Sequence, residues 1–252
     1  MTLSVEHLSK SYGALRVTDD VTFSMDTGAL VGIIGPNGAG KSTLFSLLTG
    51  FQAPDGGEIR LNDLTVTRAS AAERARAGLV RTFQVPREFA HLTVRENLLA
   101  AVPGQPGENL VNVFLRPVAV RRREAEIGQA VDETIGFLRL SKVAATPAGH
   151  LSGGQKKLVE LGRALMTGAR TILLDEPFAG VNPVLIEEIS ARIRELNGRG
   201  VGFLIIEHDL GVLSRLVDIF HVMDRGRLIA SGTPSDVLAD SAVREAYLGG
   251  LS

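Results

Sequence analysis

Residues 29–43 decide the fold, with the sequence ALVGIIGPNGAGKST. The apolar run 29–34 predicts a buried parallel strand, and we expect a helix from Lys41 to about Leu48. Between them, the pattern G-x-x-x-x-G-K-S/T predicts a loop whose backbone N–H groups hold phosphates. Strand, loop and helix in this order are typical of an α/β nucleotide-binding domain. The residues expected to bind the nucleotide are Gly35, Pro36, Asn37, Gly38, Ala39, Gly40, Lys41, Ser42 and Thr43.

Length and composition narrow the class of protein. The chain has 252 residues, with 27 Lys and Arg against 28 Asp and Glu, and no cysteine. This length suits one large α/β domain, and the balanced charge gives no reason to expect a nucleic-acid partner. The absence of cysteine suits a reducing compartment. The N-terminus lacks a signal-peptide pattern, and no apolar run approaches the ~18 residues of a membrane span. Work at a membrane would therefore need other chains to cross it.

A second phosphate site is predicted at residues 151–155, with the sequence LSGGQ. Ser152 and Gln155 have the spacing of a capping box, which predicts free N–H groups at the positive end of a helix dipole. The chain already has one phosphate loop. We therefore expect this second site to bind the nucleotide of another subunit, through Ser152, Gly153, Gly154 and Gln155.

Two carboxylates follow the apolar run 171–174, where a buried strand is expected. Ligands of parallel α/β sheets lie at the carboxyl ends of the strands. We expect Asp175 to hold Mg²⁺ together with Ser42, and Glu176 to polarise the attacking water as a general base. Lys41 is expected to reach the β- and γ-phosphates.

Three further side chains have both a functional and an ordinary interpretation. His208, after the apolar run 201–206, is expected to contact the γ-phosphate and hold the water in line with Glu176. Gln84 is expected to reach Mg²⁺ or the attacking water, with a surface glutamine as the alternative. Tyr12 is expected to stack on the adenine, with a half-buried tyrosine in a turn at residues 11–13 as the alternative.

The middle of the chain is expected to be a helical insertion, residues 86–160, in a core formed by residues 1–85 and 160–252. Thr93 and Glu96 predict a capping box that opens a helix. Residues 102–112 contain two prolines and two glycines and are expected to be a loop. A helix is expected over Arg121–Leu140, where Arg121, Arg122 and Arg123 are interpreted as a solvated face without a function. Its apolar face consists of Ile127, Val131, Ile135 and Leu138.

These motifs together resemble the ATP-binding subunit of ABC transporters, in order and spacing, over essentially the whole chain. The resemblance implies an α/β P-loop NTPase, with a RecA-like core, an N-terminal antiparallel β-subdomain and an inserted α-helical subdomain, as a single ABC ATPase domain over residues 1–252. It also implies hydrolysis of ATP with Mg²⁺. Two subunits would stack head to tail, with each ATP between residues 35–43 of one chain and residues 152–155 of the other.

Subfamily features are similar to those of the branched-chain amino acid importers, and to the larger of their two paired ATPases. They are residues 78–84, the Pro- and Gly-rich insertion after Ala101, residues 176–183 and residues 246–249. This implies coupling of ATP-driven subunit closure to permease movement at the cytoplasmic face of the inner or plasma membrane. The implied partners are a second ABC ATPase subunit, identical or related, two transmembrane permease subunits and, indirectly, a solute-binding protein. Two alternatives stay open: the ATPase of a lipopolysaccharide exporter, and a soluble ABC ATPase without a transport function.

Overall fold

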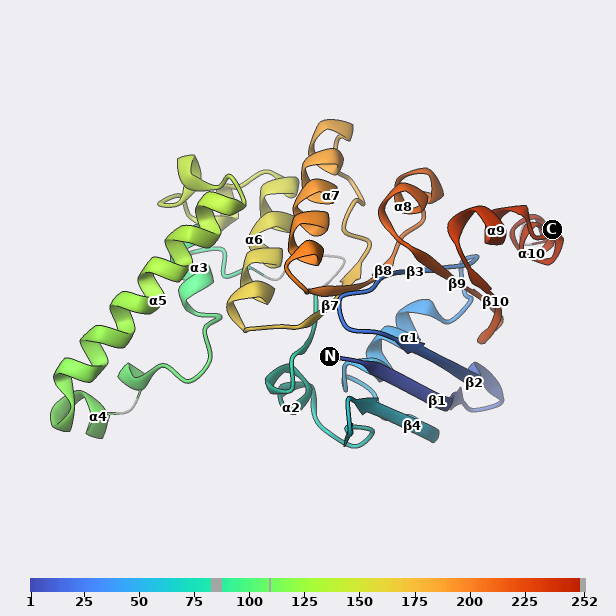
Figure 1. Cartoon of the computed structure of the whole chain (residues 1–252), viewed down its shortest axis with the longest axis horizontal. Helices are drawn as coiled ribbons and strands as arrows, with labels where there is room; N and C mark the ends of the chain where they lie inside the picture. Colours follow the sequence, from blue (N-terminus) through green and yellow to red (C-terminus); the bar gives the residue numbers. More distant parts are fainter. Residues whose placement is uncertain (83–87, 109, 250–252) are drawn as a thin grey trace. The chain divides into compact units, whose positions relative to one another are not determined.

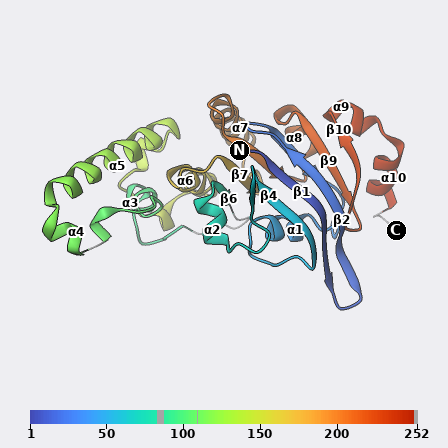
Figure 2. The same cartoon turned by 60° about the horizontal axis from the view of Figure 1, so that its bottom comes forward.

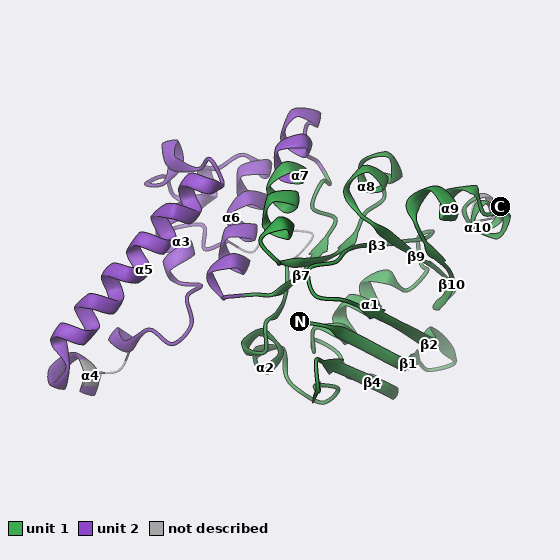
Figure 3. Cartoon of the chain, in the orientation of Figure 1, with its two compact units in different colours: residues 1–84, 169–179, 190–252 green, residues 85–168, 180–189 purple. Residues whose placement is uncertain are grey.

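The computed structural model describes residues 1–82, 88–108 and 110–249 (Figure 1). The chain divides into two compact units (Figure 3). Unit 1 comprises residues 1–84, 169–179 and 190–252, and unit 2 comprises residues 85–168 and 180–189. Each unit is built from segments that are distant in the sequence.

Unit 1 contains a six-stranded sheet within the described residues, in the order β10-β9-β3-β8-β7-β6. Its strands β6 to β9 and β3 run parallel, and β10 is antiparallel to β9. All residues of β3, β7 and β8 are buried, which explains why the predicted strands were apolar along their whole length. The bounds are β3 Leu30–Ile34, β6 Leu79–Arg81, β7 Thr171–Asp175, β8 Gly202–Ile206, β9 Ile219–Asp224 and β10 Arg227–Gly232.

A second sheet of unit 1 is antiparallel, in the order β2-β1-β4-β5. Its strands are β1 Leu3–Tyr12, β2 Leu15–Met25, β4 Gly56–Leu61 and β5 Leu64–Thr65. The turn predicted at residues 11–13 is wrong by two residues. Ser11 and Tyr12 complete β1, and Gly13 and Ala14 form the turn, because the pairing of Tyr12 with Leu15 leaves only two residues between the strands.

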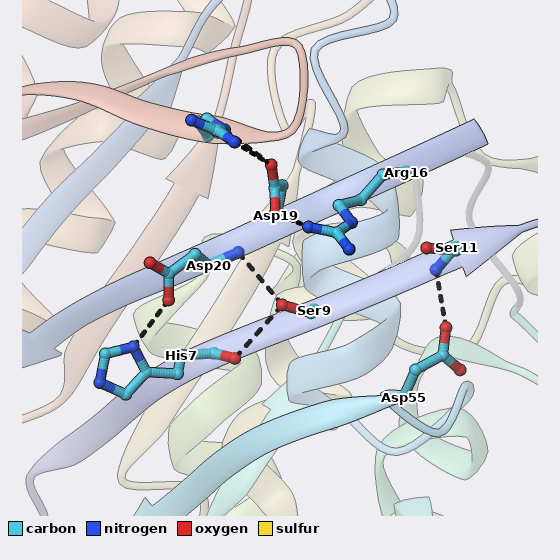
Figure 4. A network of polar contacts seen from close by, with 8 residues as sticks. His7, Ser9, Ser11, Arg16, Asp19, Asp20 and Asp55 are labelled. Carbon is cyan, nitrogen blue, oxygen red and sulfur yellow. Dashed lines mark hydrogen bonds and ion pairs between the residues drawn. The ribbon is translucent and has the colours of Figure 1, made fainter. Parts of the chain in front are cut away.

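The β1–β2 pair carries a polar network on its exposed side (Figure 4). His7 and Asp20 both have left-handed backbones, with φ of 51° and 58°, where the register of the two strands shifts. Their side chains face each other, with His7 Nδ1 2.6 Å from Asp20 Oδ1. Asp19, one residue earlier, forms ion pairs with Arg16 and Arg227. The second of these pairs connects β2 to β10.

Helix α1, Lys41–Leu48, lies between the two sheets of unit 1 (Figures 1 and 2). Its apolar side chains Leu44, Phe45, Leu47 and Leu48 are fully buried in one cluster with residues of both sheets. The predicted bounds of this helix are confirmed. The other helices of unit 1 are α2 Ala71–Arg76, α8 Leu210–Leu216, α9 Pro234–Ala239 and α10 Ser241–Gly249.

Unit 2 is built around the long helix α5, Pro117–Phe137, which packs against α3, Val94–Leu99, and α6, Gly153–Met166. Its predicted apolar face is confirmed, because Ile127, Val131, Ile135 and Leu138 are all buried. The capping box of Thr93 and Glu96 is also confirmed at the start of α3. Helix α7, Pro183–Gly198, begins in unit 2 and continues in unit 1.

Two predictions for unit 2 are wrong. The loop expected over residues 102–112 ends early, because α4 occupies Leu110–Leu115, where neither proline nor glycine interrupts the chain. Helix α5 begins at Pro117 instead of Arg121, since proline fits the first turn of a helix without the loss of a hydrogen bond. It ends at Phe137 instead of Leu140, before Arg139, which has a left-handed backbone with φ 55°. Short 3₁₀ turns occupy Pro106–Glu108, Ser141–Val143 and Ala148–His150. Within the described part of the chain, no helix has both the length and the apolar character to cross a bilayer.

Candidate functional site

The loop between β3 and α1 has a backbone that only glycine fits at its first position. Gly35 has φ 147°, and a Cβ atom there would lie 2.0 Å from the carbonyl oxygen of Met223 on β9. Lys41, the first residue of α1, is buried and donates from Nζ to the carbonyl oxygens of Gly35 and Pro36, at 2.7 and 2.9 Å. The lysine therefore folds back over the loop that precedes it.

Burial lowers the pKa of Lys41, while the negative charges of Glu176 and Asp175 raise it. The two carbonyl oxygens use two of the three hydrogens of an ammonium group. The third hydrogen remains for an anion that enters the loop. A bound phosphate would also offset the free-energy cost of burying the Lys41 charge, because water no longer solvates that charge.

A cavity of ≈ 250 Å³ brings the loop together with two of the predicted residues from other strands. Glu176 comes from the end of β7 and His208 from the end of β8, in agreement with ligand sites at the carboxyl ends of parallel strands. Gly35, Pro36 and Asp175 do not line this cavity. Its lining consists of Val17, Asn37, Gly38, Ala39, Gly40, Lys41, Ser42, Thr43, Glu176 and His208.

Glu176 and His208 lie close together at the carboxyl ends of β7 and β8. Glu176 has a left-handed backbone, with φ 48°, and its N–H donates to the carbonyl oxygen of Ile206 at 2.9 Å. This conformation turns its side chain towards His208, whose Nε2 lies 2.9 Å from Glu176 Oε1. A carboxylate paired with an imidazole can hold a water molecule in a fixed orientation and accept a proton from it.

Asp175 has a partner that sequence analysis did not identify. Arg81, at the end of β6, lies with Nη2 2.5 Å from Asp175 Oδ2 and donates from Nη1 to Ser46 Oγ at 3.0 Å. Both Arg81 and Asp175 have buried side chains, so each charge depends on the other. The sequence signal was the place of Arg81 at the end of a strand that neighbours β7.

The residues near Asp175 fit a magnesium ion that takes most of its ligands from phosphate and water. Among the described residues, no group of three His, Cys, Asp or Glu side chains could hold a metal ion alone. Mg²⁺ usually uses only one or two carboxylates and keeps substrate phosphates and water as its other ligands. Arg81 connects Asp175 to α1, which also carries Ser42. The hydroxyl of Ser42 and the carboxylate of Asp175 have the oxygen chemistry that Mg²⁺ prefers, while Asp175 is ion-paired with Arg81 and does not line the cavity.

Glu207 is a second residue that sequence analysis missed. It is buried between the ends of β7 and β8, where Oε1 accepts from the N–H of Phe178 at 2.7 Å and Oε2 from the N–H of His208 at 2.9 Å. Burial raises the pKa of Glu207, and the backbone N–H groups of Phe178, His208 and Asp209 lower it. The carboxylate therefore ties the segment after Glu176 to the segment that carries His208. A carboxylate directly before His208 was the signal in the sequence.

The C-terminal part of unit 1 completes the phosphate loop. The N–H of Gly226, in the turn between β9 and β10, donates to the carbonyl oxygen of Ala39 at 3.0 Å. The carbonyl oxygen of Gly226 accepts from the N–H of Asp19 on β2 at 2.8 Å. Burial raises the pKa of Tyr247 on α10, while the backbone N–H of Gly35 lowers it, which places the phenol beside the first residue of the loop.

Several predicted residues lie apart from the cavity. Tyr12 is not among the lining residues. Its hydroxyl donates to Gln52 Oε1, and Lys10 lies over its ring. Gln84 falls outside the described residues. Ser152 and Gln155 form the predicted capping box of α6 in unit 2. Gly153 is the first residue of that helix, and Gly154 packs so closely on Leu185 of α7 that a Cβ atom would lie 1.7 Å from its Cδ2.

Two family models match the chain. Residues 18–179 match the model described as ABC transporter, and residues 227–250 match the model described as branched-chain amino acid ATP-binding cassette transporter. The first match spans the phosphate loop, the LSGGQ segment and the two carboxylates. The second begins at the first residue of β10 and covers that strand and the C-terminal helices.

Curated relatives match over almost the whole chain. A probable branched-chain amino acid transport ATP-binding protein LivG of Methanocaldococcus jannaschii is 40% identical, over 98% of this chain and 97% of the relative. The high-affinity branched-chain amino acid transport ATP-binding protein BraF of Pseudomonas aeruginosa is 36% identical, over 98% and 97%. The lipopolysaccharide export system ATP-binding protein LptB of Acidithiobacillus ferridurans is also 36% identical, over 98% and 96%.

Solved structures agree with these matches. A nucleotide-free ATP-binding cassette from an ABC transporter superposes with a TM-score of 0.84 at 40% identity, over 98% of both chains. The ADP conformation of an ATP-binding cassette superposes with a TM-score of 0.82 at 39% identity, over 99% of both chains. These likenesses confirm the predicted α/β P-loop NTPase fold. With the family match, they show that the chain belongs to the ATP-binding cassette family of ABC transporters and is an ABC ATPase.

Proposed function

We propose that this chain is the ATP-hydrolysing subunit of an ABC importer for branched-chain or other amino acids, and the larger of two paired ATPases. The observation that carries the proposal is the match of residues 227–250 to the branched-chain amino acid transporter model. That segment lies outside residues 18–179, which match the general ABC model, so it supports the assignment independently of that match. The names of the LivG and BraF relatives support the same assignment.

Two other functions have some support. The LptB relative, at 36% identity, favours the ATPase of a lipopolysaccharide exporter as the second candidate. A soluble ABC ATPase that works on DNA or ribosomes is the third, and the net charge of −1 does not favour it. The names of the LivG and BraF relatives support amino acid transport as the first candidate.

In the proposed reaction, ATP enters the cavity at residues 35–43, where backbone N–H groups and Lys41 hold its phosphates. Ser42 and Asp175 would hold Mg²⁺, which neutralises charge on the phosphates when it is bound. Glu176 accepts a proton from the attacking water, and His208 keeps Glu176 and the water in line with the γ-phosphate. Gln84 reaches the water or the metal ion, and Tyr12 stacks on the adenine.

The proposed assembly has two ATPase subunits, identical or related, which stack head to tail. Ser152, Gly153, Gly154 and Gln155 of one subunit bind the ATP held by the loop of the other, as the position of the two glycines in the first turn of α6 suggests. We interpret unit 1 as the core with its β-subdomain and unit 2 as the helical subdomain of one ABC ATPase domain over residues 1–252. Two permease subunits and, indirectly, a solute-binding protein complete the importer, at the cytoplasmic face of the membrane.

Replacement of Glu176 tests the chemistry. The Glu176→Gln variant keeps the size of the side chain and loses the base, so we expect ATP binding as in the wild type and almost no turnover. The control is Glu133→Gln, the same change on an exposed residue of α5. Binding is measured with a fluorescent ATP analogue and turnover by phosphate release. Turnover at the normal rate in Glu176→Gln would refute the role of this residue.

Affinity capture of the full chain from native membranes tests the importer. Recovery of two different permeases, a second ATPase and a solute-binding protein supports the proposal. Recovery of lipopolysaccharide export components, or of ribosomal or DNA-repair proteins alone, overturns it in favour of the second or third candidate. Uptake of radiolabelled leucine by cells with and without the gene then tests the solute.

A further inference from the structure

The end of unit 2 where α4 meets α5 exposes large apolar side chains to solvent. Phe114, Leu115 and Val118 expose 79%, 75% and 78% of their surface, and Val113 exposes 37%. Helix α4 lies beside the first turns of α5, at the end of α5 that points away from α6 (Figures 1 and 2). We call residues 113–123 the α4–α5 tip. Apolar side chains that project together from a surface mark a site of interaction.

The backbone of the tip explains why these side chains project. Arg116 interrupts the two helices, with φ −136° and ψ 49°, and Pro117 starts α5. On α5, the residues that face the interior of unit 2 are Val120, Ile127 and Val131. Val118 is exposed, and so are Arg121 and Arg122, which follow it by three and four residues on the same side of the helix. An apolar side chain and a cationic pair therefore share one exposed stripe.

The tip has an excess of positive charge. Residues 113–123 contain four arginines and no Asp or Glu, and Glu124 and Glu126 follow on α5, in a chain whose net charge is −1. Arg122 and Arg123 share a single carboxylate, Glu126, at 3.2 Å from each. The tip therefore combines projecting apolar side chains with an excess of positive charge directly behind them.

We propose that the α4–α5 tip inserts into the headgroup region of an anionic lipid bilayer. Segments that lie at a bilayer surface place Phe, Leu and Val in the boundary with the acyl chains and Arg against acidic headgroups. The side chains of the tip stand out from the surface, and a fluid interface accepts such a shape without a matching cavity. The positive charge complements anionic lipid. This inference rests on the membrane location of the proposed function, and it adds a contact that needs no permease.

Vesicle sedimentation tests the proposal with the purified full chain. We expect binding to phosphatidylglycerol-rich vesicles, weak binding to pure phosphatidylcholine vesicles, and a loss of binding at high salt. The double variant Phe114→Ser and Leu115→Ser should bind at least about tenfold more weakly. Arg116→Gln and Arg121→Gln should each weaken binding by about fivefold. The control is Leu64→Ser, which removes an exposed leucine on β5 of unit 1 and should leave binding unchanged.

Solution ATPase activity, measured on the same samples, separates this proposal from the proposed function. All these residues are exposed and outside the nucleotide cavity, so the tip variants should keep the wild-type rate. If active wild-type protein does not bind anionic vesicles, or if the double variant binds them as well as the wild type, the tip proposal alone is overturned. Binding to detergent-solubilised permease through the tip, or self-association lost in the double variant without lipid, also overturns it. An absence of ATPase activity in the wild type would instead overturn the proposed function.

Discussion

Replacement of Glu207 by glutamine should separate nucleotide binding from turnover. The carboxylate accepts backbone N–H groups from Phe178 and His208, which lie on the two segments that carry the proposed base and its histidine partner. A glutamine side chain has one oxygen. Its NH₂ group must then face at least one backbone N–H, donor against donor.

The size of the effect follows from the two hydrogen bonds. Hydrogen bonds to a charged group contribute about 1.5–3 kcal/mol each, and an unsatisfied buried donor costs about 1–3 kcal/mol. We therefore expect Glu207→Gln to lower the free energy of unfolding by about 2 kcal/mol. If a comparable part of this energy holds Glu176 and His208 in place, kcat falls by roughly tenfold to thirtyfold. Glu207 is not among the residues that line the cavity, so KM for ATP should stay close to the wild-type value.

The assay is steady-state phosphate release over a range of ATP concentrations, with urea unfolding on the same protein. Glu133→Gln, the same chemical change on the exposed side of α5, serves as the matched control and should alter neither measurement. A kcat for Glu207→Gln within twofold of the wild type, in a protein that is folded, would refute the positioning role. A large rise in KM with unchanged kcat would also contradict it.

Three further predictions concern the loop, the buried ion pair and the buried histidine. Gly35→Ala drives a Cβ atom into a carbonyl oxygen of β9 and should weaken ATP binding at least about tenfold, measured with a fluorescent analogue, whereas Gly136→Ala, in open space on α5, should not. Arg81→Ala leaves Asp175 buried without its partner and should lower the free energy of unfolding by about 3 kcal/mol in urea; a loss under about 1 kcal/mol would contradict the pairing. Burial lowers the pKa of His221 to about 4 from 6.5. The unfolded chain therefore binds more protons between these values, and stability is lost as the pH falls. The free energy of unfolding should decrease from pH 7 to pH 5 by about 2 kcal/mol more in the wild type than in His221→Gln.

Local patterns made much of the fold predictable. Strands β3, β7 and β8 are buried over their whole length, so each appears in the sequence as an uninterrupted apolar run. The capping boxes at Thr93 and Ser152 were readable because both partners lie three residues apart. Such signals need no knowledge of what packs against them.

The contacts that shape the site are not local. Arg81 and Asp175 are 94 residues apart, and Phe178 and Glu207 are 29 apart, so periodicity carries no trace of either pair. Gly226 meets Ala39 only after the whole sheet is assembled. Helix α4 was not predicted for a different reason. The prolines and glycines before it led to the prediction of a loop over the whole segment up to residue 112. Pairings over long sequence distances require the topology, which the sequence pattern alone does not supply.

The central place of β3 in its sheet has a consequence for the synthesis of the chain. Its neighbours β8 and β9 follow it by about 170 residues or more, so at 5–20 residues per second β3 waits about 10–30 s for its partners. During that time an apolar segment with two open edges depends on chaperones or on the ribosome surface to avoid aggregation. A chain that stops before Gly226 also lacks the turn that completes the phosphate loop. The contacts that complete the phosphate loop therefore form only after translation has passed Gly226.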